Sequence, residues 1–110
     1  MGIGDSADAT REATVAQYFV RVVLHGATAA DYSDLHAEMA KVGGDRTIRG
    51  DSGTVYDLPD AEYVLHNTLE VEAVRDAIVA IAAGIRSDPS VLVIEVIRSA
   101  WRLAIVPGVS

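Results

Sequence analysis

The stretch from Tyr18 to His66 constrains the fold of this 110-residue chain more than any other segment. It opens with an apolar run, Tyr18 to His25, in which the β-branched and aromatic residues typical of strands dominate. Gly26 permits a sharp turn, and apolar residues at helical spacing follow from Thr28 to about Val42. The pattern predicts a strand that turns directly into a helix.

The alternation of this strand divides its side chains between two faces. One face holds Tyr18, Val20, Val22 and Leu24, and the other holds Phe19, Arg21, Val23 and His25. Because the second face contains both polar members, we expect the first to form the core. In the helix, Thr28 is predicted to be the N-cap, with Asp31 in the acidic position of a capping box. The apolar stripe of the helix is Tyr32, Leu35, Met39 and Val42, and Gly43-Gly44 ends it.

Two short strands are predicted next, at Arg46–Arg49 and Thr54–Leu58, joined by a hairpin turn at Gly50–Gly53. Pro59 interrupts pairing, so Glu62–His66 is either a further strand or the same strand continued past a bulge.

The last third of the chain predicts a second helix at Leu69–Ala83, capped by Thr68. Ser90–Arg98 is nearly continuous in apolar residues, which predicts a central, well-buried strand. Ala100–Val106 is a candidate for one more strand.

This order predicts an α+β fold, a ferredoxin-like β-α-β-β-α-β sandwich with two helices on one face of an antiparallel sheet and a candidate extra C-terminal strand. We expect a flexible leader at residues 1–15, a single domain at 16–106 and a tail at 107–110.

The composition limits the classes of partner and chemistry. A net charge of −7 opposes broad, non-specific binding to nucleic acids and fits a basic protein partner or simple solubility equally well. The absence of cysteine excludes disulfides, thiolate catalysis and zinc–thiolate sites. No signal peptide and no apolar run of membrane-spanning length is visible, so we expect a cytoplasmic protein with no membrane partner.

The candidate catalytic groups are few. The chain has no P-loop, dinucleotide-binding fingerprint, nucleophile elbow or His-Glu-x-x-His motif. His25, His36 and His66 do not have metal-ligand spacing, so we expect no metal and no cofactor. His25 is the best placed because it ends a strand just before a loop, whereas His36 is expected at the boundary of the helix's apolar stripe. Asp34 and Glu38 lie one turn apart and could hold a divalent cation, although a solvated helix face is the simpler interpretation.

Basic and aromatic side chains predict a surface for binding. The set is Arg21, Arg46, Arg49 and Arg98 with Phe19, Tyr56 and Trp101. Cations combined with stacking rings on an open sheet face bind single-stranded RNA in other proteins. A dimer interface or an ordinary sheet edge explains the same residues. Glu95 interrupts an apolar strand, and we expect it to pair with Arg21 across the open face.

Four segments resemble a known family. They are Tyr18–His25, Asp31–Leu35, Arg46-Thr47-Ile48 and Leu58–Tyr63. These segments are similar to small bacterial and phage proteins grouped with the GhoS antitoxin of a type V toxin–antitoxin pair, which are related in fold to the small CRISPR-associated ferredoxin-fold endonucleases. The resemblance implies a cytoplasmic, homodimeric endoribonuclease that cleaves the messenger RNA of a membrane-active toxin in a groove between subunits. In the related nucleases an acidic residue commonly stands at the position of His25.

The first hypothesis is therefore an RNA-directed antitoxin that cleaves RNA without a metal. His25 would be the general base, and Arg46 and Arg49 would hold the phosphate. The RNA-binding residues would be Phe19, Arg21, Tyr56, His66 and Arg98. The second hypothesis is a non-enzymatic protein-interaction or regulatory module, of host or phage origin, on a ferredoxin-like dimer. A small-ligand regulatory domain is a third, from fold analogy alone.

Overall fold

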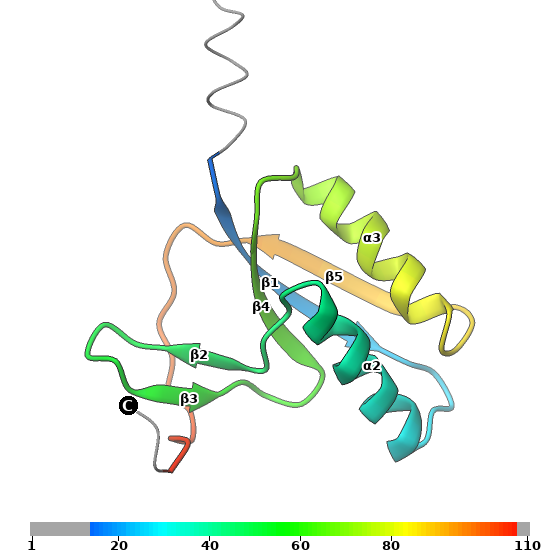
Figure 1. The fold of residues 1–110 in the computed structure, drawn as a ribbon, viewed down its shortest axis with the longest axis horizontal. Coiled ribbons are helices and arrows are strands. Elements are labelled where there is room, and N and C mark those ends of the chain that lie inside the picture. Colours follow the sequence, from blue (N-terminus) through cyan, green and yellow to red (C-terminus); the bar gives the residue numbers. More distant parts are fainter. Residues whose placement is uncertain (1–13, 108–110) are drawn as a thin grey trace, which may run out of the picture.

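A computed structural model describes residues 14–107, so the leader expected at 1–15 and the tail expected at 107–110 fall mostly outside the described residues. The elements are β1 (Ala16–Val23), α2 (Ala29–Lys41), β2 (Thr47–Arg49), β3 (Val55–Asp57), β4 (Glu62–Asn67), α3 (Val71–Ala83) and β5 (Ser90–Glu95) (Figure 1). Of the two interpretations of Glu62–His66, the structure shows the separate strand.

The strands form two antiparallel sheets rather than one. The larger sheet has three strands in the order β4-β1-β5, and the smaller pairs β2 with β3. A single backbone bridge, between Asp45 and Val64, connects the β2 side of the chain to the outer edge of β4. The protein is therefore an α+β molecule with two helices, and the single continuous sheet that we expected is divided.

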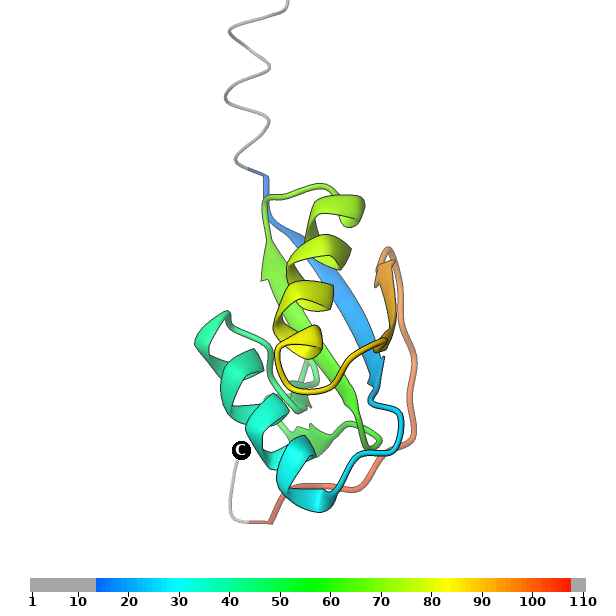
Figure 2. The same cartoon turned by 90° about the vertical axis from the view of Figure 1, so that its right-hand side faces the viewer.

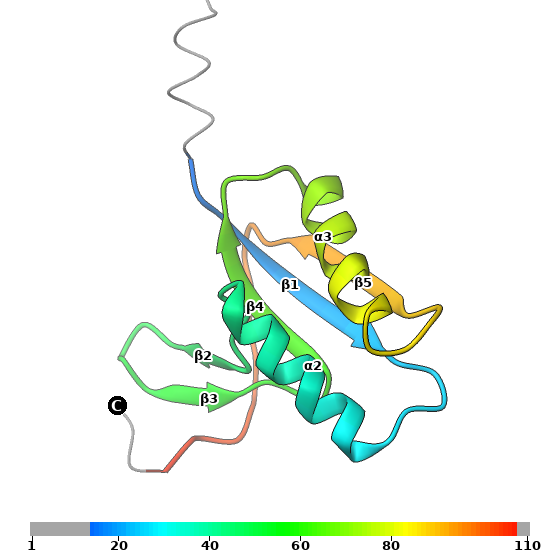
Figure 3. The same cartoon turned by 45° about the vertical axis from the view of Figure 1, so that its right-hand side comes forward.

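Both helices lie on the same side of the three-stranded sheet, and the segment that follows β5 runs on the other side (Figure 2). The predicted core face of β1 is confirmed, since Tyr18, Val20, Val22 and Leu24 are all buried. Figure 3 shows α3 lying along β5 and α2 nearer β4. The helices contribute Leu35, Met39, Val74, Ile78 and Ala82 to this core, and β4 contributes Tyr63 and Leu65.

The last major strand begins at Ser90 as predicted, but its predicted extent to Arg98 and its central, buried position are wrong. β5 is an edge strand, ends at Glu95, and exposes 56% of Leu92 and 51% of Ile94. Its apolar continuity indicated burial on both faces, but both helices cover the same face of the sheet, and Leu92 and Ile94 point to the other. Glu95 lies opposite Tyr18 on the helix side, so it does not pair with Arg21, which pairs with Glu62 at 3.7 Å.

The segment after β5 crosses to the smaller sheet. The Asp57 N–H donates to the Ala104 carbonyl (2.8 Å), and the Val106 N–H donates to the Val55 carbonyl (2.9 Å). The candidate strand at Ala100–Val106 is therefore reduced to one bridge, between Tyr56 and Ile105. This contact extends the smaller sheet beyond the β2–β3 hairpin.

The two helices begin differently. The predicted capping box of α2 is confirmed, with the Asp31 N–H donating to Thr28 Oγ1 (3.1 Å) and the Thr28 N–H donating to the Asp31 carboxylate (3.0 Å). The predicted cap of α3 is wrong: Glu70 is its N-cap, and no side chain caps it. The stripe of α2 is also shorter than predicted, because Val42 lies past the helix and is 46% exposed.

Candidate functional site

The three residues predicted to cleave RNA do not meet within one chain. His25 follows the end of β1, where its Nε2 lies 2.9 Å from Ser90 Oγ. Arg49 lines a cavity with Gln17 at the start of β1, and its guanidinium donates to the Gly53 carbonyl in the hairpin turn. β1 is 8 residues long, so its two ends lie roughly 23 Å apart. Arg46 is not among the residues that line this cavity, although Asp45 and Thr47 beside it are, and its charge acts on His36 and Tyr63.

The residues predicted to bind RNA lie in three different parts of the structure. Phe19 and Arg21 share the face of the larger sheet turned away from the helices, and His66 pairs with Gln17 on the same face. Tyr56 belongs to the smaller sheet, where its ring meets Trp101 edge to face with centroids 5.8 Å apart. Arg98 lies in the exposed segment after β5.

A cavity of about 490 Å³ opens where β1 ends and β4 begins. It is lined by Arg21, Val23, Ala29, Tyr32, Ser33, His36, Asp60 and Ala61. We call it the His36 pocket. The first two turns of α2 supply one wall, the end of β1 a second, and the loop before β4 the third. It brings a cation, a carboxylate, a hydroxyl and an imidazole around a small apolar surface.

His36 is held at this pocket by a buried tyrosine. Its Nδ1 lies 2.6 Å from the Tyr63 hydroxyl, and Tyr63 is fully buried on the core face of β4. Burial lowers the pKa of His36, the positive charge of Arg46 lowers it further, and Asp60 acts in the opposite direction. Burial also raises the pKa of Tyr63 to about 12. At neutral pH the imidazole is therefore neutral and the phenol keeps its proton.

This pair assigns the tautomer of His36. A buried phenol must donate its proton to a partner, and among the described residues its partner is the Nδ1 of His36. The Nδ1 is then the acceptor and the ring proton sits on Nε2. His36 therefore offers a neutral N–H donor, whereas a general base would need a free lone pair.

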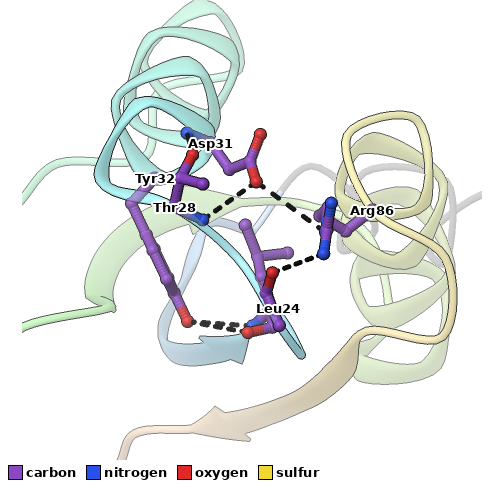
Figure 4. Close-up of polar contacts among 6 residues, drawn as sticks. Leu24, Thr28, Asp31, Tyr32 and Arg86 are labelled. Atoms are coloured by element: carbon purple, nitrogen blue, oxygen red, sulfur yellow. Dashed lines mark hydrogen bonds and ion pairs between the residues drawn. The ribbon is translucent and has the colours of Figure 1, made fainter.

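Hydrogen bonds fix the helical wall of the pocket to the loops around it (Figure 4). The Tyr32 hydroxyl accepts from the Leu24 N–H (2.9 Å) and donates to the Leu24 carbonyl (3.3 Å). Arg86, just after α3, donates to the Gly26 carbonyl and lies 3.7 Å from the capping carboxylate of Asp31. The β1–α2 turn, α2 and the α3–β5 turn are thereby joined beside the pocket.

The opposite wall contains a strained residue. Ala61 has φ of +65°, a left-handed conformation that costs a non-glycine residue about 1–2 kcal/mol. Its carbonyl accepts a hydrogen bond from the Val22 N–H (3.0 Å), which ties the loop to β1. Such strain persists where the surrounding structure imposes it, and it clusters at functional sites.

Metal sites and membrane spans can be assessed in the part of the chain from residue 14 to residue 107. Within that range no three His, Asp or Glu side chains gather in a way that could hold a metal ion. Glu38, half of the acidic pair considered for a cation, instead binds Lys41 at 2.8 Å. No helix formed by these residues has the length and apolar character needed to cross a bilayer.

The face of the larger sheet away from the helices is the second notable surface. Along β1 and β5, Phe19 pairs with Ile94 and Arg21 with Leu92, so apolar side chains of both strands are adjacent there. Ile97, just beyond β5, is 92% exposed. We call Phe19, Leu92 and Ile94 the apolar face.

Comparison of the chain with protein-family models, with curated proteins and with solved structures produced no match.

The sequence interpretation missed the pairing of His36 with Tyr63. The two residues are 27 positions apart on different elements, so no local spacing links them. One signal was available: Tyr63 alternates onto the same face as Leu65, and a buried tyrosine hydroxyl requires a polar partner.

Proposed function

We propose that this protein is a non-catalytic interaction module that pairs with a second copy of itself through the free edge of β5. The observation that carries the proposal is an edge strand with little protection. β5 contains no proline, and its one charged residue is Glu95 at its end, although natural edge strands are usually blunted by such residues. The exposed side chains of Leu92 and Ile94 belong to this edge strand and to the apolar face, so the edge and the apolar surface adjoin.

Hydrogen-bond geometry fixes the register of this pairing. The Val96 N–H donates to the Gln17 carbonyl (2.9 Å), so even-numbered residues of β5 bond to β1. The backbone groups of Val91, Val93 and Glu95 then face outward. An antiparallel pair of β5 strands centred on Val93 satisfies all of them. The same register sets Leu92 of one copy opposite Ile94 of the other, where cross-strand side chains lie close together.

A ferredoxin-like arrangement belongs to the same proposal. β1 has antiparallel neighbours on both sides, and Asp45 bridges the outer edge of β4 at Val64, where a fourth strand of such a sheet would pair. We interpret the β2–β3 hairpin as the counterpart of this fourth strand. After the bridge at Asp45 the hairpin turns away from β4 and forms its own sheet. The arrangement leaves β5 as the edge that is available to a second copy.

Sedimentation velocity over a range of protein concentrations tests the proposal. We expect the wild-type chain to form a dimer and Leu92→Lys to be monomeric, because a charge at this position opposes burial of the edge. Val42→Lys is the matched control, since Val42 is also exposed but lies at the end of α2. A monomeric wild-type protein at 100 μM or above, roughly the range of weak self-association, contradicts the proposal, as does an unaltered dimer in Leu92→Lys.

An RNA-directed antitoxin related to the GhoS group is the second proposal. It is supported by the shared face of Phe19, Arg21 and His66, which combines a ring with cationic and hydrogen-bonding groups. The net charge of −7 and the separation of His25 from Arg49 weigh against it. Cleavage of single-stranded RNA with and without EDTA, compared with His25→Ala, tests the chemistry. Loss of cleavage in His25→Ala supports His25 as the general base. If the protein does not bind RNA at low salt, this function is excluded.

A further inference from the structure

We infer that the His36 pocket binds a small aliphatic α-amino acid in its zwitterionic form. The inference goes beyond the proposed self-association and does not depend on it, because every residue that lines the pocket belongs to one chain. The volume of about 490 Å³ falls in the lower part of the range for small-molecule sites, about 300–1,000 Å³.

The charges of the pocket match a zwitterion better than a simple ion. Arg21, a cation on the outer face of β1, and Asp60, a carboxylate in the loop before β4, both line this cavity. A phosphate would meet repulsion from Asp60, and an amine alone would meet repulsion from Arg21. An α-amino acid carries a carboxylate and an ammonium group on neighbouring atoms, so it satisfies both residues at once. Arg21 pairs with Glu62 only at 3.7 Å and its side chain is 60% exposed, so donors remain for a ligand carboxylate.

His36 and Ser33 add neutral hydrogen bonds to this recognition. With Nδ1 occupied by the Tyr63 hydroxyl, the Nε2–H is the remaining donor of the imidazole ring, which suits a carboxylate oxygen. Tyr63 and the Tyr32–Leu24 bonds hold this wall in place before a ligand arrives. A preformed site loses less conformational entropy on binding, which favours affinity for a small molecule.

The remaining lining defines the side chain of the ligand. Val23, Ala29 and Ala61 are small and apolar, so the wall accommodates a short hydrocarbon side chain and offers no polar partner to a longer polar group. The left-handed backbone of Ala61 keeps the loop against β1 at this wall. Alanine, valine and leucine are the ligands that fit this description.

Titration of the ¹⁵N-labelled protein with L-valine tests the inference by NMR. The controls are 3-methylbutanoate, which lacks the ammonium group, and 2-methylpropylamine, which lacks the carboxylate. We expect saturable shifts of the Ser33, His36 and Ala61 amides with L-valine, and an affinity at least tenfold weaker for either control. L-alanine and L-leucine complete the series. No saturable binding of these three amino acids, or equal binding of valine and 3-methylbutanoate, overturns the inference.

Two variants locate the ligand. Arg21→Gln and Asp60→Asn each remove one charge from the pocket, and each is expected to weaken L-valine binding at least tenfold. Arg102→Gln and Asp51→Asn make the same changes at exposed positions outside the pocket and are expected to bind as the wild type does. Binding that survives in both pocket variants contradicts the assignment. The Leu92→Lys chain is expected to bind L-valine normally, so failure of the dimer and failure of the pocket are separable.

Discussion

The hydrogen bond between His36 and Tyr63 connects the protonation of one side chain to the stability of the core. Tyr63 is fully buried and donates to Nδ1, so a proton on Nδ1 removes its acceptor. Burial, with the charge of Arg46, already opposes the charged imidazole. His36 therefore binds a proton less readily in the folded chain than in the unfolded chain.

This difference predicts a pH dependence of stability. Because the folded pKa of His36 is below the unfolded value of about 6.5, its contribution is fully present above about pH 6.5 and is lost as the pH falls through the folded pKa. Urea unfolding between pH 5 and pH 8 measures it. We expect the free energy of unfolding of His36→Gln to vary less over this interval than that of the wild type. His66→Gln, at an exposed position, is the control, and equal slopes for His36→Gln and the wild type contradict the linkage.

At the scale of elements, the two helices have different local signals at their starts. Thr28 and Asp31 form a reciprocal capping box, and Asp31 also lies 3.7 Å from Arg86, so the start of α2 is connected to the end of α3. At α3, Thr68 and Leu69 lie before the helix. Glu70 is the N-cap, and no side chain makes a capping hydrogen bond. Threonine thus caps the first helix but not the second.

Matched substitutions test this asymmetry. Thr28→Ala is expected to lower the free energy of unfolding by about 1 kcal/mol, because the Asp31 N–H loses its acceptor. Thr68→Ala is expected to change it by less than about 0.5 kcal/mol. Chemical denaturation of both variants measures the difference. A cost at Thr68 equal to that at Thr28 would show that α3 is capped in solution by the side chain that the sequence suggested.

At the scale of the whole molecule, the smaller sheet depends on a distant part of the chain. β2 and β3 have 3 residues each, and an isolated hairpin of this size is marginal in water. It is joined to the rest by the Asp45–Val64 bridge and by the segment that binds β3 through Ala104 and Val106. We therefore expect this sheet to open more readily than the larger one.

Proline substitutions test how much the hydrogen bonds from this segment to β3 stabilise the smaller sheet. Val106→Pro removes the N–H that donates to Val55, whereas Ile105→Pro removes an N–H that points away from β3. Loss of one such bond, about 1 kcal/mol, is expected to speed amide exchange at Asp57 about fivefold. Exchange in β1 is expected to stay unchanged in both variants. Equal exchange at Asp57 in the two variants would contradict a role for this segment in holding the smaller sheet.

The sequence by itself determined the features that depend on neighbouring residues. Alternation in β1 identified its buried face, and the Thr28–Asp31 spacing identified the α2 cap, because both follow from backbone geometry over a few positions. Tertiary structure decided the rest. Apolar continuity made β5 resemble a central strand, but the strand lies at the edge because the chain after Glu95 crosses to β3. The His36 pocket likewise arises where β1, α2 and the loop before β4 meet. Residues that meet from distant segments have no characteristic spacing in the sequence, so no local pattern could predict the pocket.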